Sequence, residues 1–292
     1  MVKAVCALAL CAGLLFPALA NASLTLHGAD GRTLALAQPA TRVVSLAPDL
    51  TELAYDAGAG SALVGADAYS NYPAAAKKLP RIGDAFRFDM ERIVALRPDL
   101  VLAWQGGTPQ AVIARLRELK LPVLVIGTHA LPDIAANLEL IGRATGHETE
   151  AHAAAQTYLA ELKKLRDEYA HRKPVRVFYE ISTQPLFTLG GDQIVSRVIT
   201  LCGGYNIFSD IKQPAASVSL ENVLARDPQA IVTGGDAGAA ARLKAWQRWP
   251  QISAVRTGSL FSIPGDVMTL ATPRMLEGGK RLCADVESVR NH

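Results

Sequence analysis

The sequence predicts an α/β protein with two Rossmann-like lobes, each a parallel-sheet sandwich, joined by one long rigid α-helix. Three observations predict this class. Short apolar strand candidates alternate with helical segments along most of the chain. A motif around Glu91 returns around Glu221, a spacing too long for a solenoid repeat. Between the copies, residues 148–173 keep a helical pattern free of proline and glycine.

The repeated motif indicates two similar lobes. Residues 90–102 read as a helix that Glu91 opens and that stops before Pro98, followed by an apolar strand. Residues 220–232 repeat this order around Glu221. Proline cannot continue a helix and disfavours helical backbone in the residue before it. We therefore expect the same helix–turn–strand unit in each lobe.

The first 22 residues are predicted to be a secretory signal peptide. One lysine precedes the apolar run 4–15, and small residues stand near the expected cleavage point at residues 21–23. A lipid anchor at Cys11 is disfavoured because Leu10 is bulky where a lipoprotein signal has a small residue. The run is too short to span a membrane. We expect a periplasmic protein.

Residues 23–147 are predicted to form the N-terminal lobe. Residues 23–38 alternate apolar and polar side chains around Asp30-Gly31, a strong hairpin signal. The remaining expected elements are strands at 42–46, 63–66, 99–103 and 122–126, and helices at 51–57, 109–119 and 131–145. Strands that alternate with helices indicate a parallel sheet.

Residues 148–173 are predicted to form the connecting helix, and residues 174–292 the C-terminal lobe. The helix places Tyr158, Leu162 and Tyr169 on one face. Its length of about 35 Å is sufficient to bridge two lobes. In the second lobe the expected elements are strands at 175–181, 230–233 and 260–263, and helices at 193–201, 243–249 and 273–289.

Cys202 and Cys283 are the only thiols left after the leader is removed. In an oxidising compartment a disulfide between them is the economical interpretation, and the alternative is two buried free thiols. Closing a loop of roughly 80 residues would stabilise the fold by about 4 kcal/mol.

Several classes of function are disfavoured by what the chain does not contain. The formal net charge is +3, without a block of basic residues, so no nucleic-acid partner is expected. There is no G-x-S-x-G, Walker or G-x-G-x-x-G motif, and the histidines show no H-E-x-x-H pattern. We expect no enzyme activity, no catalytic residues, no metal site and no cofactor.

Aromatic residues follow several predicted strands. Tyr69 comes after the strand at 63–66, Trp104 after 99–103, and Phe187 after 175–181. Ligands of open α/β sheets gather at the carboxyl ends of strands. Each ring alone is equally compatible with ordinary packing, but their common placement favours a ligand cleft between the lobes.

The chain resembles the periplasmic cobalamin-binding proteins of vitamin B12 import, which belong to the helical-backbone (class III) substrate-binding proteins. The segments that carry the resemblance are 42–48, 51–54, 69–73, 90–101, 103–104, 202–208 and 223–226, in the family's order and over almost the whole mature chain. The resemblance implies a monomer that captures cobalamin or a related corrinoid, a macrocyclic small molecule, between its lobes. It also implies delivery to the permease and ATPase complex of an ABC transporter at the inner membrane, without covalent chemistry.

Residue by residue, the resemblance implies Tyr69, Trp104, Phe187 and Asp266 as ligand contacts. It also matches the cysteine pair to the family's disulfide positions. The chain departs from the family's pattern at three expected contacts, where it has Ala85, Ala215 and Leu270. Phe86 stands beside the first of these gaps, and we include it among the ligand contacts. Loss of two large rings removes apolar contact area for a corrin.

The resemblance further implies that Glu91 and Glu221 dock onto arginines of the permease. Two carboxylates on opposite lobes would act as salt-bridge anchors. The alternative is that each glutamate only stabilises the start of its helix, by about 0.3–1 kcal/mol.

Two other functions stay open at this point. A receptor of the same class could bind heme or an iron-siderophore, with Tyr69 or Tyr72 as a metal ligand. An exported enzyme or lectin-like module on the same fold is disfavoured because no nucleophile–base pair or metal triad can be assembled from the sequence.

Overall fold

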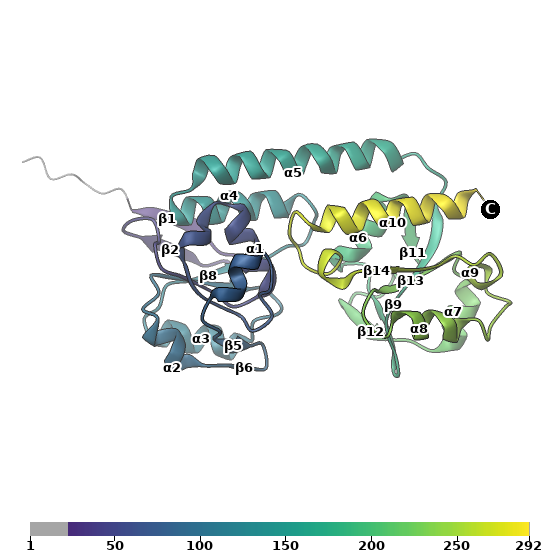
Figure 1. Ribbon diagram of the computed structural model, residues 1–292, viewed down its shortest axis with the longest axis horizontal. Helices are drawn as coiled ribbons and strands as arrows, with labels where there is room; N and C mark the ends of the chain where they lie inside the picture. The colour runs from purple at the N-terminus through teal and green to yellow at the C-terminus, as the bar shows by residue number, and fades with distance from the viewer. Residues whose placement is uncertain (1–22, 292) are drawn as a thin grey trace, which may run out of the picture.

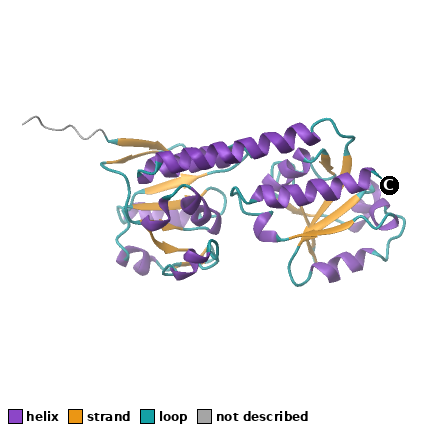
Figure 2. Cartoon of the chain, turned by 45° about the horizontal axis from the view of Figure 1, so that its top comes forward, coloured by secondary structure: helices purple, strands orange, loops and turns teal. Residues whose placement is uncertain are grey.

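The computed structural model describes residues 23–291, so the predicted signal peptide lies outside the described residues. Two α/β lobes stand next to each other, and the helix α5 (Glu148–Tyr169) runs along both of them (Figures 1 and 2). The fold class predicted from the sequence is confirmed. In the described range, no helix is both long enough and apolar enough to cross a membrane.

The N-terminal lobe is built on a four-stranded parallel sheet with the order β4-β3-β7-β8. Its strands are β3 (Val43–Ser45), β4 (Leu63–Ala66), β7 (Leu100–Trp104) and β8 (Val123–Ile126). Its helices are α1 (Pro48–Asp56), α2 (Met90–Ala95), α3 (Gln110–Glu118) and α4 (Asp133–Thr145). The predicted hairpin forms from β1 (Leu24–His27) and β2 (Thr33–Leu36), and Gly31 supplies the positive φ of 76° in its turn. A short hairpin of β5 (Gly83–Asp84) and β6 (Arg87–Phe88) was not predicted.

The sheet of the C-terminal lobe is mixed, and this corrects the expectation of a purely parallel sheet. The strands are β9 (Val175–Thr183), β10 (Leu186–Leu189), β11 (Gly204–Asn206), β12 (Ala215–Ser217), β13 (Ala230–Gly234) and β14 (Leu260–Ile263). Strands β11, β9, β13 and β14 pair in parallel, whereas β10 is antiparallel to both β9 and β12. Only residues 184–185 separate β9 from β10, and so short a connection can only join antiparallel strands.

The predicted helices of the C-terminal lobe form in the predicted order, one of them shifted at both ends, and a short helix at 253–256 was not predicted. The helices of this lobe are α6 (Ile194–Leu201), α7 (Leu220–Arg226), α8 (Ala239–Trp246), α9 (Ser253–Arg256) and α10 (Met275–Arg290), with a short 3-10 turn η3 (Gly265–Val267). The helix expected at 243–249 begins earlier and ends at Trp246. Pro250 disfavours helical backbone at Trp249, and the helix ends before that residue is reached.

Helix α5 connects the lobes through a continuous apolar core. Its 22 residues span about 33 Å, and it buries Tyr158, Leu162 and Tyr169, as the sequence pattern predicted. The Tyr158 hydroxyl donates to the carbonyl of Leu131 at 2.9 Å. One core cluster contains these side chains together with residues of both sheets. Cys202, at the end of α6, forms the predicted disulfide with Cys283 of α10.

The duplicated motif takes the same backbone shape in both lobes. Helices α2 and α7 are each followed by a non-glycine residue with positive φ, Arg97 (47°) and Asp227 (41°), directly before the proline. An arginine holds each strained carbonyl: Arg42 Nε donates to Arg97 O at 3.1 Å, and Arg176 Nε donates to Asp227 O at 2.8 Å. The repeat seen in the sequence is therefore a repeated structural unit, including its strained residue.

Candidate functional site

Tyr69 lies in the loop after β4 and is 63% exposed. Its backbone N–H donates to Asp67 Oδ1 at 2.8 Å, and Arg81 Nη1 donates to the carbonyls of Asp67 and Ser70. Asp67 and Ser70 are buried. Buried residues and Arg81 thus hold the backbone of this loop in place, and the Tyr69 side chain is exposed to solvent.

Trp104 is the last residue of β7 and is 42% exposed. A Cβ atom at Gly107 would lie 1.7 Å from Cε3 of its ring, so the indole rests directly on this glycine. Thr108 accepts a hydrogen bond from the Trp104 backbone N–H at 2.9 Å. The close approach of ring and backbone leaves one aromatic face for a partner.

Phe86 occupies the tip of the β5–β6 hairpin and is 95% exposed. The Asp84 carboxylate accepts from the N–H groups of Phe86 and Arg87 and closes the turn. The hairpin is tied to the Tyr69 loop, because Ala68 N–H donates to Gly83 O at 2.8 Å. The hairpin therefore holds an exposed ring beside the loop that carries Tyr69.

The C-terminal lobe contributes the other two predicted ligand residues. Phe187 is half-buried on β10, where its register partners are Ser182 and Ser217. Asp266 lies on η3 with its side chain 60% exposed, and it pairs with Arg274 Nη2 at 3.0 Å. In Figure 1 the β5–β6 hairpin and β12 lie on the sides of the two lobes that face each other.

Arg274 connects the two lobes. Its Nη1 atom lies 3.0 Å from Oε1 of Glu52 on α1, and its guanidinium lies 3.7 Å from the ring centre of Tyr72. Thr272 Oγ1 donates to the other oxygen of Glu52 at 3.1 Å. Burial raises the pKa of Glu52 to about 7, against the opposing effect of Arg274. This buried contact fixes the N-terminal lobe beside Asp266.

A hollow of about 320 Å³ opens in the C-terminal lobe at the carboxyl ends of β9 and β13. Ala215 is one of its lining residues. The other departures from the family's pattern are Ala85, which is exposed beside Phe86, and Leu270, which is half-buried after η3. Sheets of this kind hold ligands at the same strand ends.

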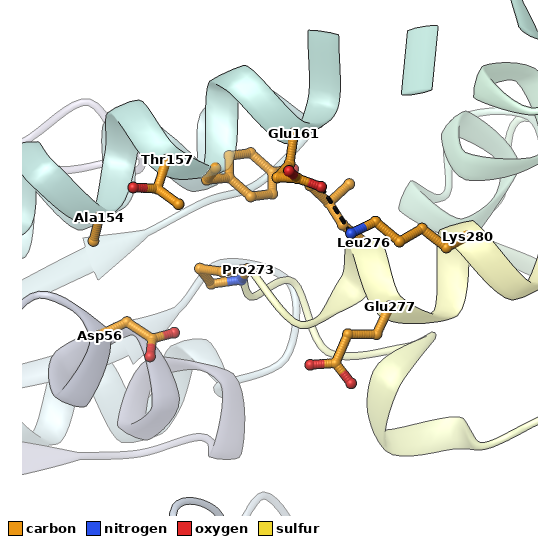
Figure 3. A pocket seen from close by; sticks show the side chains of 9 residues that line it. Asp56, Ala154, Thr157, Glu161, Pro273, Leu276, Glu277 and Lys280 are labelled. Atoms are coloured by element: carbon orange, nitrogen blue, oxygen red, sulfur yellow. Dashed lines mark ion pairs between the residues drawn. The ribbon is translucent and has the colours of Figure 1, made fainter. Parts of the chain in front are cut away.

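A second hollow, of about 310 Å³, lies between α5 and α10 with Asp56 of α1 at one side (Figure 3). The ion pair of Lys280 Nζ with Glu161 Oε2, at 2.7 Å, crosses it. None of the ligand residues predicted from the sequence lines this hollow. The candidate ligand site is therefore the facing sides of the lobes and not this helix junction.

The two glutamates of the repeat are exposed in the first turns of α2 and α7. Figure 1 shows these helices on the side of the lobes away from α5, one on each lobe. Hydrogen bonds from its own backbone N–H and from the Ser219 hydroxyl lower the pKa of Glu221. Helix N-caps at Asp89 and Ser219 already accept from backbone N–H groups, so neither glutamate is required as the cap.

Two α/β lobes on one long helix, with exposed aromatic rings on the N-terminal lobe, define a two-lobed substrate-binding protein. The chain belongs to the periplasmic binding protein family, whose profile matches residues 43–267. It is 40% identical over 254 residues to the vitamin B12-binding protein of Yersinia pestis (strain Pestoides F), covering 87% of this chain and 89% of that protein.

Solved structures give the same family. The periplasmic vitamin B12 binding protein BtuF of Vibrio cholerae superposes with a TM-score of 0.82 at 36% identity, covering 87% of this chain and 99% of the other. A periplasmic heme binding protein from Pseudomonas aeruginosa superposes with a TM-score of 0.74 at 26% identity, covering 85% and 92%.

Sequence reasoning missed three polar side chains on the facing sides of the lobes. These are Arg274 and, in the hollow of the C-terminal lobe, Tyr179 and Arg242. The sequence pattern identifies Tyr179 as an ordinary core residue of a strand, and Arg274 acts through Glu52, which is 222 residues away in the sequence. No motif in the sequence marks these three side chains.

Proposed function

We propose that this protein captures cobalamin or a related corrinoid between its two lobes in the periplasm and delivers it to the permease and ATPase complex of an ABC transporter at the inner membrane. The lobes are residues 23–147 and 174–292, and residues 148–173 connect them. The protein acts as a monomer, without catalysis and without a cofactor of its own.

The observation that carries this proposal is the set of exposed rings fixed on the N-terminal lobe. Phe86, Tyr69 and Trp104 are 95%, 63% and 42% exposed, and hydrogen bonds hold the backbone that carries each of them. Exposed, rigid aromatic area suits a large flat ligand. The 40% identity with a vitamin B12-binding protein supports a corrin ring as that ligand.

In this proposal Phe187 and Asp266 hold the ligand from the C-terminal lobe. A carboxylate accepts hydrogen bonds from amide N–H groups, which surround a corrin ring. The shared core along α5 and the Glu52–Arg274 contact support small lobe movements on binding.

A thermal-shift panel with cyanocobalamin, hemin and a ferric siderophore tests the ligand class. A ligand at 100 times its dissociation constant stabilises the folded state by about 2.7 kcal/mol. We expect cyanocobalamin alone to raise Tm. A rise in Tm with hemin only would identify heme, and not a corrinoid, as the ligand.

Heme or an iron-siderophore remains the second candidate, because the Tyr69 side chain is exposed where a metal ion could be reached. Hemin that binds through this phenolate would give a Soret band that Tyr69→Phe removes. Tyr72 suits this role less well, since the Arg274 guanidinium covers one face of its ring.

The exposed glutamates of α2 and α7 are proposed to dock onto permease arginines. Glu91→Lys combined with Glu221→Lys should abolish uptake by reversing both charges, while ligand affinity stays within about twofold because neither residue is among the proposed ligand contacts. Glu148→Lys at the exposed start of α5 serves as a charge control. Normal uptake by the double variant would limit both glutamates to a local role in their helices.

A further inference from the structure

The hollow of about 320 Å³ in the C-terminal lobe lies beside the contact between the lobes. Thr269 forms part of its wall, and the chain continues from there to Thr272 and Arg274, which contact Glu52 of the other lobe. Gln193, the N-cap of α6, forms another part of the wall. The hollow is thus placed to receive one edge of a ligand held between the lobes.

Ala215 contributes only a methyl group to this wall. It is exposed on the edge strand β12, opposite Leu189 of β10. Tyr179 is the only aromatic residue among those that line the hollow. No other large ring therefore takes the place of the aromatic side chain that the family's pattern has at position 215. A tryptophan at this position would occupy part of the hollow.

The Tyr179 hydroxyl is available inside the hollow. The side chain is only 3% exposed, and its hydroxyl makes no hydrogen bond with any residue of 23–291. Among these residues, no fully enclosed polar side-chain atom lacks a partner, so the hydroxyl oxygen is not fully enclosed, and the hollow is the cavity that Tyr179 lines. Burial raises the pKa of Tyr179 to about 12, so the group is a hydrogen-bond donor at neutral pH.

The charged side chains that line the hollow, Arg242, Asp236 and Glu180, already have hydrogen-bond or ion-pair partners within the protein. Arg242 donates through Nε to Thr233 Oγ1 at 2.9 Å and through Nη2 to Gly234 O at 2.7 Å, and its Nη1 pairs with Asp236 at 3.0 Å. Glu180 accepts from Thr183 and Trp246. The hollow thus offers no unpaired positive charge to a carboxylate, whereas a neutral group that both donates and accepts can be satisfied there.

We propose that this hollow is a subsite for a neutral carboxamide side chain of the bound macrocycle, with the Tyr179 hydroxyl donating to the amide carbonyl. The inference rests on the proposed function and adds a chemical preference to it. A macrocycle that carries peripheral amides enters the subsite, and one that carries carboxylates in the same place is disfavoured.

The test is calorimetric titration of the full mature protein with cyanocobalamin. Ala215→Trp narrows the hollow, and we expect binding to weaken at least tenfold. If position 215 were only an aromatic contact with the ligand, Ala215→Trp would instead bind cyanocobalamin more tightly, because the new ring would add contact area. Equal or tighter binding by Ala215→Trp would overturn the subsite.

Tyr179→Phe removes one hydroxyl and keeps the ring, so we expect two- to tenfold weaker binding. Tyr205→Phe is the matched control, since Tyr205 is 49% exposed on β11 and does not line the hollow. Thermal melts check that each variant is folded, and position 215 is exposed enough to tolerate substitution. Equal affinities of the two Tyr→Phe variants would contradict the hydrogen bond.

Monocarboxylic acid derivatives of cyanocobalamin test the amide preference. The derivative that carries a carboxylate in place of the amide contacted by Tyr179 should bind the wild-type protein at least tenfold more weakly than cyanocobalamin does. If all the derivatives bind as tightly as cyanocobalamin, the preference is wrong. Failure of the wild-type protein to bind cyanocobalamin at all would instead count against the proposed function.

Discussion

Replacement of Arg274 by alanine should destabilise the protein, because Arg274 is the charged partner of a buried carboxyl group. The Glu52 and Arg274 side chains are 4% and 15% exposed, and their atoms approach to 3.0 Å. Arg274→Ala also removes the contacts with Asp266 and the Tyr72 ring. The variant therefore removes the ion pair between the lobes and also the contacts of Arg274 with two groups beside the candidate ligand site.

The magnitude follows from the protonation of Glu52. Without its partner the carboxyl group can take up a proton, and at pH 8, one unit above its pKa of about 7, this costs about 1.4 kcal/mol. The lost charged hydrogen bond and the cation–π contact add about 2 kcal/mol. We expect a total loss of about 3 kcal/mol at pH 8, which lowers Tm by about 6–12 °C.

Urea unfolding at pH 8 and pH 6 is the assay. At pH 6 Glu52 is already mostly protonated, so the loss should fall to about 2 kcal/mol. Arg281→Ala is the control on the same helix, since Arg281 is exposed and makes no ion pair with any residue of 23–291; its effect should stay below about 0.5 kcal/mol. A loss below about 1 kcal/mol at pH 8, or a larger loss at pH 6, would refute this reasoning.

Three further predictions concern stability and the position of the indole. Because the pKa of Glu52 is raised from 4.5 to about 7, the neutral carboxyl group stabilises the folded state at pH values below 4.5, and this stability is lost as pH rises through about 7. Between these two pH values the wild-type protein should lose on the order of 3 kcal/mol of stability relative to Glu52→Gln. Parallel pH profiles of the two proteins would contradict this prediction. Reduction of the Cys202–Cys283 disulfide, whose cysteines are 81 residues apart, should lower stability by about 4 kcal/mol; an unchanged melt with two titratable thiols would oppose this. Gly107→Ala places a Cβ 1.7 Å from Cε3 of Trp104, so we expect the ring to move and cyanocobalamin to bind at least about fivefold more weakly; unchanged affinity would show that the ring position is unimportant.

The sequence was most informative where a structure depends on neighbouring residues. The apolar face of α5, the Asp30-Gly31 hairpin and the repeated helix–proline–strand unit are local patterns, and all three appear in the structure. Strand β10 was not predicted, because its four residues are too short an apolar pattern to distinguish a strand from a loop. The two-residue turn before it was the available clue.

The site was predictable only in part for a related reason. The exposure of Tyr69, Trp104 and Phe86 agrees with a role in ligand contact, but the contact itself is still a prediction. The roles of Arg274 and Tyr179 depend on groups far away in sequence and on an open space beside them. No residue pattern along the chain contains that information.

Fluorescence titration with cyanocobalamin tests the central claim most directly. Trp246 is buried and Trp249 packs against the same core, so Trp104 is the exposed indole that a ligand between the lobes would cover. We predict saturable quenching at one ligand per chain with a dissociation constant of about 1 μM or below, and loss of most of the quenching in Trp104→Phe. No quenching of the wild-type protein, together with no heat of binding at about 100 μM ligand, a concentration at which a complex with a 1 μM constant would be saturated, would contradict the account.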